Sequence, residues 1–213
     1  DNNKAYYRGK RIHSAVTVFF SMAPTAQPVF NAGNILLYNG AIGTVFCQKL
    51  MLSALSENKD SGIFNADERR IIDAYLPWTR KIRRTRTSFH GEEIDLIDFV
   101  RKNKDKLVLK PSVGLGGDDV FVGYSTPQDQ WEQLVDRAIE KRIWLAQEFH
   151  KPVSHLYQAG ENGFGEFRSI WGFFTFGNRY IDGFLRVIPE KIFSGVINCK
   201  LGATVGMFLE VED

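Results

Sequence analysis

The sequence predicts an α+β fold, because helical and strand-like patterns occupy different stretches of one chain. Residues 63–105 are mostly helical in pattern, residues 106–150 alternate apolar strands with an amphipathic helix, and residues 167–211 form strand-like runs. The 213 residues are 44% hydrophobic and 24% charged, ordinary values for a globular chain with a sizeable core. This composition argues against a wholly disordered protein.

Net charge, hydropathy and cysteine content exclude several further classes of protein. The 27 Lys and Arg residues against 25 Asp and Glu leave a net charge of +2, too near neutral for nucleic-acid binding by bulk charge. No apolar run approaches the roughly 18 residues of a membrane-spanning helix. Cys47 and Cys199 are too few for a disulfide framework, and the four histidines lack a metal-ligand spacing. We therefore expect a cytoplasmic protein without a membrane segment.

The first 62 residues are apolar and dotted with glycines. Residues 15–20 and 34–38 predict strands, and residues 45–55 predict a helix. Neither an initiator methionine nor a signal-peptide pattern stands at Asp1, so we expect a processed or truncated piece that lacks upstream residues.

The next stretch is helical and charged. Asn65 and Glu68 have capping-box spacing at the start of a helix that Pro77 ends. Residues 80–86 hold five basic residues in seven and predict a strand or extended loop. Residues 92–102 predict another helix, with an apolar face that turns inward.

Residues 106–150 alternate between strands and one helix. Three short apolar runs predict strands: residues 107–109, 120–122 and 143–149. A glycine loop at residues 114–117 separates the first two, and Thr126 is placed to cap the following helix with Pro127 at its first position. The tail has four further strand-like runs: residues 167–176, 180–187, 192–198 and 204–211.

The glycine loop is the most informative feature for function. Glycines allow backbone N–H groups to close around an anion, and Lys110 at the end of the preceding strand supplies positive charge for phosphate oxygens. The alternative is a β-hairpin whose glycines only form a turn. The spacing matches neither the P-loop nor the dinucleotide-binding motif.

The order of these segments resembles the ATP-grasp superfamily. The resemblance rests on Lys110-Pro111, the glycine loop, the Val-x-Val-Gly run at 120–123, a Trp-containing helix and Ala-Gln-Glu-Phe at 146–149. Upstream, three stretches are similar to circularly permuted ATP-grasp proteins: Glu-Arg-Arg at 68–70, Leu-Pro-Trp-Thr-Arg at 76–80 and Tyr-Arg-Gly-Lys-Arg-Ile at 7–12. The resemblance covers most of the chain, although each of its motifs is short.

The resemblance implies a two-lobed clamp that holds ATP between two antiparallel sheets flanked by helices. It implies a permuted segment over residues 1–76, a nucleotide-binding lobe over 77–150 and an antiparallel β tail over 151–213. The residues it assigns to the site are Arg80 and Lys110 on the phosphates, Gly114, Gly116 and Gly117 in the flap, and Gln147, Glu148 and Phe149 in the hinge. Two assignments have plain alternatives: Arg80 as one more solvated charge, and Glu148 as a surface carboxylate.

The implied reaction is ATP-dependent ligation of a small-molecule or peptide carboxylate to an amine, or to a thiol, through an acyl phosphate. Its cofactors are ATP and Mg²⁺, and Arg80 and Lys110 are the expected catalytic cations. The rival reading is a non-catalytic nucleotide- or ligand-binding module of the same fold. A third reading, in which the basic run at 80–86 follows a nucleic-acid backbone, has no recognisable RNA or DNA module to support it.

Two departures from the family pattern favour the non-catalytic reading. Asp118 and Asp119 follow the glycines, where two carboxylates repel a triphosphate unless a cation lies between them. No Glu-x-Asn pair for Mg²⁺ is present before Lys110, and Asn198, Glu166 and Asp182 are only scattered candidates. The metal ligands are therefore unassigned, and we expect weak nucleotide binding without turnover from these residues alone.

Overall fold

The computed structural model describes residues 3–16, 27–38, 41–114, 117, 119–160, 163–206 and 209. The chain divides into two compact units, Asp1–Leu52 and Ser53–Asp213. It is a mixed α+β protein in which nearly all strand pairs of the described residues are antiparallel, so the predicted fold class is confirmed at this level. No helix within the described ranges is long and apolar enough to cross a membrane.

The first unit contains two small strand pairs. Strands β1 (Ala5–Tyr7) and β2 (Lys10–Ile12) form an antiparallel hairpin, whereas β3 (Ser14–Val16) and β4 (Leu36–Tyr38) pair in parallel. Helix α1 (Gln27–Asn31) precedes β4, and α2 (Ala41–Phe46) follows it. The strand predicted at 15–20 is present at its first two residues, and 17–20 lie outside the described residues.

The helix predicted at 45–55 is interrupted, which corrects that expectation. Helix α2 ends at Phe46, and α3 (Leu50–Asn58) begins four residues later and continues into the second unit. The interruption replaces helical hydrogen bonds with tighter turns, because the Gln48 N–H donates to the Val45 carbonyl and the Met51 N–H to the Gln48 carbonyl.

The second unit begins with α3, α4 (Ala66–Tyr75) and a four-stranded sheet. The sheet order is β5–β10–β8–β9, formed by Thr79–Lys81, Trp144–Glu148, Leu107–Pro111 and Phe121–Val122. All three pairings are antiparallel, as the resemblance implied for these segments. The capping box of α4 is also confirmed, since Asn65 and Glu68 each accept the other's backbone N–H.

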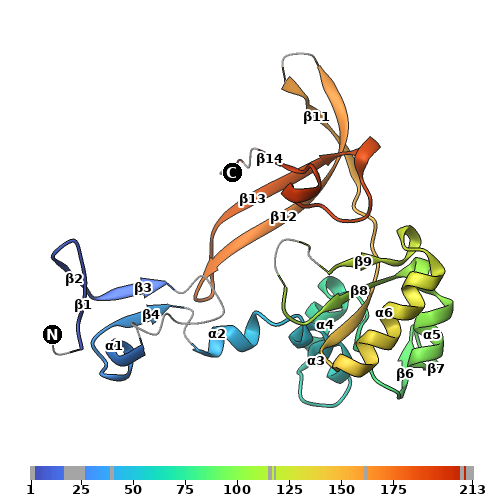
Figure 1. Ribbon diagram of the computed structural model, residues 1–213, viewed down its shortest axis with the longest axis horizontal. Helices are drawn as coiled ribbons and strands as arrows, with labels where there is room; N and C mark the ends of the chain where they lie inside the picture. Colours follow the sequence, from blue (N-terminus) through green and yellow to red (C-terminus); the bar gives the residue numbers. More distant parts are fainter. Residues whose placement is uncertain are drawn as a thin grey trace. The chain divides into compact units, whose positions relative to one another are not determined.

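Helices α5 (Leu96–Lys102) and α6 (Gln128–Lys141) cover one face of this sheet (Figure 1). The α6 pattern is confirmed: Trp131, Leu134, Val135 and Ala138 are buried with Leu107 and Leu109 of β8 and Trp144 and Ala146 of β10. Short 3₁₀ turns at Lys104–Lys106 and Gly123–Ser125 connect these elements.

The prediction of a helix over 92–102 is wrong for its first four residues. Residues Glu92–Asp95 form β7, which pairs antiparallel with β6 (Arg86–Phe89). His90 and Gly91 both have positive φ, 48° and 90°, and form the turn between these strands. The helix starts only at Leu96, where the Asp95 carboxylate accepts the Asp98 N–H.

The predicted cap of α6 is also wrong. The Thr126 hydroxyl donates to the Val122 carbonyl at 2.8 Å instead of accepting a helix N–H. Pro127 therefore occupies the N-cap position, where it offers no side-chain hydrogen bond, and the first helical carbonyl acceptor is its own.

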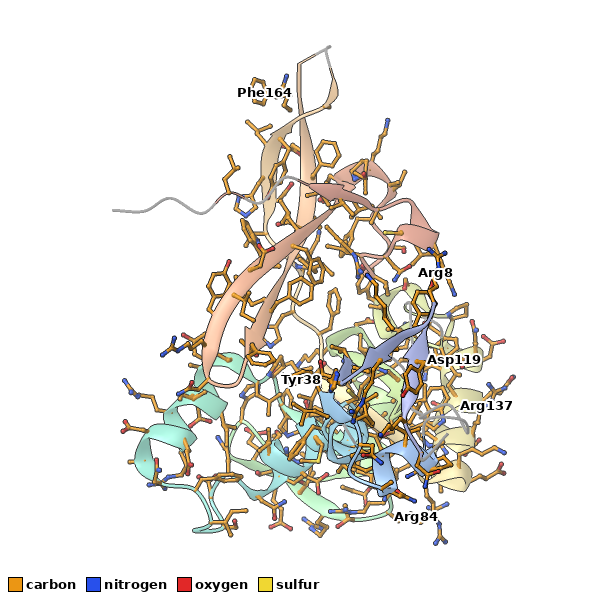
Figure 2. The ribbon with its side chains drawn as sticks, turned by 90° about the vertical axis from the view of Figure 1, so that its left-hand side faces the viewer. Arg8, Tyr38, Arg84, Asp119, Arg137 and Phe164 are labelled. Carbon is orange, nitrogen blue, oxygen red and sulfur yellow. The ribbon has the colours of Figure 1, made fainter. Side chains whose placement is uncertain are left out.

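The remaining strands form a second antiparallel sheet in the order β11–β12–β13–β14. These strands are Ser154–Gln158, Phe164–Phe176, Arg179–Pro189 and Thr204–Gly206. Figure 2 shows Phe164 at the far end of the β11–β12 hairpin, where 76% of the residue is exposed. The predicted strand at 204–211 is confirmed for 204–206, and most of its remainder lies outside the described residues.

The strand predicted at 192–198 is absent from this described part of the chain. Glu190–Ile192 form a 3₁₀ turn, residues 193–198 form an irregular loop, and Cys199–Leu201 form another 3₁₀ turn. Gly195 has a φ of 107°, which an extended strand does not accommodate. Strand β11 was not predicted, because its sequence carries few strand-favouring apolar residues.

Candidate functional site

The register of the first sheet determines which side chains share a face. Residues directly opposite each other in antiparallel strands point to the same side. Leu145 lies opposite both Lys81 and Lys110, and Gln147 lies opposite both Thr79 and Val108. We call this set the Lys110 face, which also includes Val122 opposite Val108: Thr79, Lys81, Val108, Lys110, Val122, Leu145 and Gln147. It is the face away from α5 and α6, since Leu109 and Ala146 pack on the helices.

A chain of polar contacts crosses the Lys110 face. The Lys110 ammonium donates to the Gln147 side-chain carbonyl at 2.5 Å. The Gln147 amide nitrogen donates to the Thr79 hydroxyl at 2.8 Å, and that hydroxyl donates to the Pro77 carbonyl at 2.8 Å. Gln147 is therefore a neutral partner that holds the Lys110 ammonium on this face.

Arg80 lies on the opposite face. It pairs with Ala146, and its side chain is 6% exposed beneath the β6–β7 hairpin. The Arg80 guanidinium donates to four neutral acceptors and lies 4.9 Å from the Trp78 ring centroid. Burial lowers the pKa of Arg80, an effect that nearby Glu57 opposes and Arg83 adds to. The structure therefore does not bring Arg80 and Lys110 together.

The hinge residues are split between the two faces. The Gln147 side chain belongs to the Lys110 face, whereas Glu148 lies opposite Leu107 and so points to the Arg80 side. There a Glu148 oxygen lies 3.0 Å from Nε2 of His90, and the other lies 3.7 Å from Nε2 of His150. Glu148 is thus a half-buried carboxylate with histidine neighbours, which differs from the plain surface alternative.

Some backbone N–H and carbonyl groups of the hinge form hydrogen bonds within the protein, and others do not. The Glu148 N–H donates to the Trp78 carbonyl, and the Phe149 N–H donates to the Lys106 carbonyl, both at 2.8 Å. The Phe149 ring packs 5.2 Å from the Tyr124 ring, measured between centroids. Within the described part of the chain, the Glu148 carbonyl and the His150 N–H accept and donate no hydrogen bond, so these groups remain for a ligand.

The glycine loop approaches the connection between β13 and β14. Gly114 and Gly117 are described, while Gly116 and Asp118 lie outside the described residues. Gly117 has a φ of 79°, and a Cβ there would lie 3.3 Å from Cγ1 of Val196. A Cβ on Gly195 would lie 2.9 Å from Cγ2 of Val122, so the 193–198 loop lies over the Lys110 face at β9.

None of the described residues after the loop belongs to a cluster of three or more metal-ligand side chains. Asp119 has a φ of 56°, in the left-handed region. The Asn198 side-chain oxygen accepts the Lys200 N–H, and the Asp182 carboxylate accepts the Gly183 N–H. Across the ranges that the structure describes, no three His, Cys, Asp or Glu side chains gather as metal ligands. The described side chains thus assign no ligands to Mg²⁺, which proteins usually hold with one or two carboxylates together with substrate phosphates.

Sequence reasoning missed Lys81 as a candidate cation. Lys81 sits next to Arg80 in the basic run, and its position opposite Leu145 puts it on the same face as Lys110. The two-residue period of a strand groups Arg80 with the apolar Ile82 and separates Lys81 from both, but only the structure shows that Ile82 is fully buried and that its set faces the core. Lys81 then falls on the other side.

Comparisons with known proteins add no identification. Neither a protein-family model nor a curated protein matches this chain.

Proposed function

We propose that the second unit is a nucleotide-binding module of the ATP-grasp type, with the ATP phosphates on the Lys110 face. The observation that carries the proposal is the antiparallel order β5–β10–β8–β9, which puts Lys81 and Lys110 on either side of Leu145. Two strand spacings separate them, roughly 10 Å between backbones, so two long side chains can converge on one phosphate chain. The glycine loop follows directly after the Lys110 strand.

The adenine ring is proposed to lie at the hinge, next to the apolar part of the same face. Val108 and Val122 share the face with Lys110 but are buried, and the 193–198 loop packs against Val122. At the hinge, the Glu148 carbonyl can accept a hydrogen bond from the exocyclic amine of adenine, and the His150 N–H can donate to a ring nitrogen. This arrangement supports a nucleotide held between the two sheets.

The finer proposal is carboxylate–amine ligation in a circularly permuted ATP-grasp protein. In this reaction the γ-phosphoryl group passes from ATP to an oxygen of a small-molecule or peptide carboxylate, and the amine then displaces phosphate from the acyl carbon. Lys110 and Lys81 would neutralise the charge of the phosphoryl oxygens, which is the main contribution of protein side chains to phosphoryl transfer.

A non-catalytic nucleotide-binding module is the second candidate. Two observations favour it: Arg80 is turned to the opposite face, so the Lys110 face lacks one expected cation, and Asp119 follows the glycine loop with its negative charge. Phosphate release from ATP in the presence of candidate carboxylic acids and amines separates the two. Release that depends on an acid supports the ligase, and binding without release supports the module.

Calorimetric titration of the chain with ATP, with and without MgCl₂, tests the binding proposal. Lys110→Ala is expected to weaken ATP binding about ten- to 150-fold, the range for one lost charge-assisted hydrogen bond. Lys102→Ala is the matched control, because Lys102 is an exposed lysine of α5 whose nearest acid, Asp98, lies 4.0 Å away. Equal ATP affinity in the Lys110 variant and the parent would refute the phosphate site.

A further inference from the structure

A cavity lies on the Arg80 side of the first sheet. It has a volume of about 680 Å³, within the range of small-molecule sites. Its walls come from the end of α3, the second half of α4, the β6–β7 turn and the hinge. Because Arg80 and the Glu148 side chain both point away from the Lys110 face, this cavity is separate from the proposed phosphate site.

Two buried polar groups line the cavity, Arg80 and Ser56, each 6% exposed. The Ser56 hydroxyl oxygen accepts from Nη1 of Arg80 at 2.8 Å and from the Thr79 N–H at 3.1 Å. Both contacts use Ser56 as an acceptor, and its hydroxyl proton meets no acceptor among the described residues. A buried hydroxyl of this kind has a donor to offer to a ligand.

The Arg80 guanidinium also has an N–H donor that can bind a ligand. Its guanidinium has five N–H donors, and four are used: by Thr87, Ser56 and the carbonyls of Thr79 and Ser88. One Nη2 proton has no acceptor in the described part of the chain. The remaining donor of Arg80 and that of Ser56 belong to neighbouring groups, which suits the two oxygens of one carboxylate.

Electrostatics favours an anionic group at this point. All four acceptors of Arg80 are uncharged, although a buried charge is costly without a counter-charge. Glu57 acts on Arg80 through space, but its carboxylate binds Arg83 at 2.7 Å and the Lys81 N–H at 2.8 Å. A ligand carboxylate would supply the missing counter-charge.

The acidic residues that line the cavity favour a ligand that also has a positively charged group. Two cations and three acids line the cavity, and together they carry one net negative charge: Lys59, Arg80, Asp60, Asp73 and Glu148. Lys59 is paired with Asp73. Asp60 has no ion pair with any described residue, and a purely anionic ligand would be repelled by the acids.

We propose that this cavity binds a small zwitterion, an amino acid or short peptide. Its carboxylate takes the free donors of Arg80 and Ser56, and its ammonium group faces Asp60 and Glu148. Ile72 and the Trp78 ring, which also line the cavity, provide apolar surface for the body of the ligand. Its polar side chains lie on the opposite face of the sheet from Lys110. The two proposed sites meet only at the hinge, where the nucleotide would use backbone groups of Glu148 and His150 and the zwitterion would use the Glu148 side chain.

Calorimetric titration of the 213-residue chain with L-leucine, L-glutamine and alanyl-leucine tests this proposal. At least one probe is expected to bind with a Kd of about 1 mM or below, an affinity typical of physiological small molecules. The matched single-charge probes 4-methylpentanoate and 3-methylbutylamine, which are leucine without its amine or its carboxylate, should bind at least tenfold more weakly. Saturable binding of the single-charge probes at equal affinity would overturn the zwitterion assignment.

Substitutions of residues that line the cavity test whether the zwitterion binds there. Ser56→Ala should weaken zwitterion binding about tenfold, as for one hydrogen bond to a charged group. The matched control is Ser53→Ala on the same helix, since Ser53 is buried but lies outside the cavity lining. Asp60→Asn should weaken the zwitterions but not 4-methylpentanoate. Unchanged affinity in both Ser56→Ala and Asp60→Asn would refute the site.

Two measurements with ATP test whether the zwitterion site is separate from the proposed nucleotide site. Lys110→Ala is expected to leave zwitterion affinity unchanged, and saturating ATP should not displace the probe. Displacement by ATP would place both ligands in one site and overturn the separate cavity. Zwitterion binding by a chain that fails to bind ATP would support this proposal while refuting the nucleotide-binding one.

Discussion

Arg80 and Lys110 lie on opposite faces of one sheet, although they pair with consecutive residues of β10, Ala146 and Leu145. Side chains alternate along a strand, so a shift of one residue moves a charge from the helix-covered face to the Lys110 face. Arg80 therefore stabilises the packing of the β6–β7 hairpin and α3 against the sheet, and Lys81 takes the place beside Lys110.

Replacement of Arg80 should cost stability without changing the Lys110 face. In Arg80→Met the half-buried Thr87 hydroxyl loses the Arg80 donor and the buried Ser56 hydroxyl keeps only the Thr79 N–H, so we expect the free energy of unfolding to fall by about 1–3 kcal/mol. Urea unfolding measures this loss. The control is Arg84→Met, since Arg84 is an exposed arginine of the same segment, labelled in Figure 2, and should change stability by less than about 0.5 kcal/mol. A tenfold loss of ATP affinity in Arg80→Met would show that Arg80 acts on the phosphates after all.

Trp131 is the largest fully buried side chain of the main core, and its indole N–H donates to the Val100 carbonyl at 2.9 Å. Trp131→Ala should lower the free energy of unfolding by about 3–5 kcal/mol, because it leaves a cavity between α6 and the sheet. Trp131→Phe should cost less, since it removes mainly the hydrogen bond. The exposed Trp171 provides the comparison: Trp171→Phe should be nearly neutral in the same chemical denaturation experiment.

The capping box of α4 predicts a graded response at Asn65. Asn65→Ala removes the acceptor for the Glu68 N–H and should destabilise the protein by about 0.5–2 kcal/mol. Asn65→Gly should cost only a few tenths of a kcal/mol, because glycine is itself a favourable N-cap residue. Thermal unfolding followed by circular dichroism distinguishes the two. Equal losses in both variants would mean that the side-chain cap contributes little.

Gly195 is expected to tolerate no side chain. Its φ of 107° is disfavoured for other residues, and a Cβ would lie 2.9 Å from both the Tyr124 hydroxyl and Cγ2 of Val122. Gly195→Ala should therefore lower the melting temperature and loosen the 193–198 loop over β9. Gly177→Ala separates backbone strain from crowding, because Gly177 also has a positive φ, 62°, but nothing within 4 Å of its Cβ position. Similar melting temperatures for both variants would argue against a close approach of the loop.

Local sequence signals were reliable where one short segment contained all the interacting groups. The α4 capping box joins Asn65 to a residue three positions away, and the apolar period of α6 lies within one helix. The apolar runs at 107–109 and 143–149 were long enough to define strands by themselves. Sequence reasoning failed at residues 92–95, where a turn at His90 and Gly91 let β7 pair with β6 in place of the helix.

The sequence by itself determined the α+β class, the capped helix, the strand that carries Lys110 and the glycine loop after it. Only the tertiary structure decided which of two neighbouring cations, Arg80 or Lys81, shares a face with Lys110. It also decided that Arg80 and Ser56, 24 residues apart, meet at a cavity. The physical reason is that alternation along a strand fixes two sets of side chains, whereas the packing of α5 and α6 on Leu109 and Ala146 selects which set is buried.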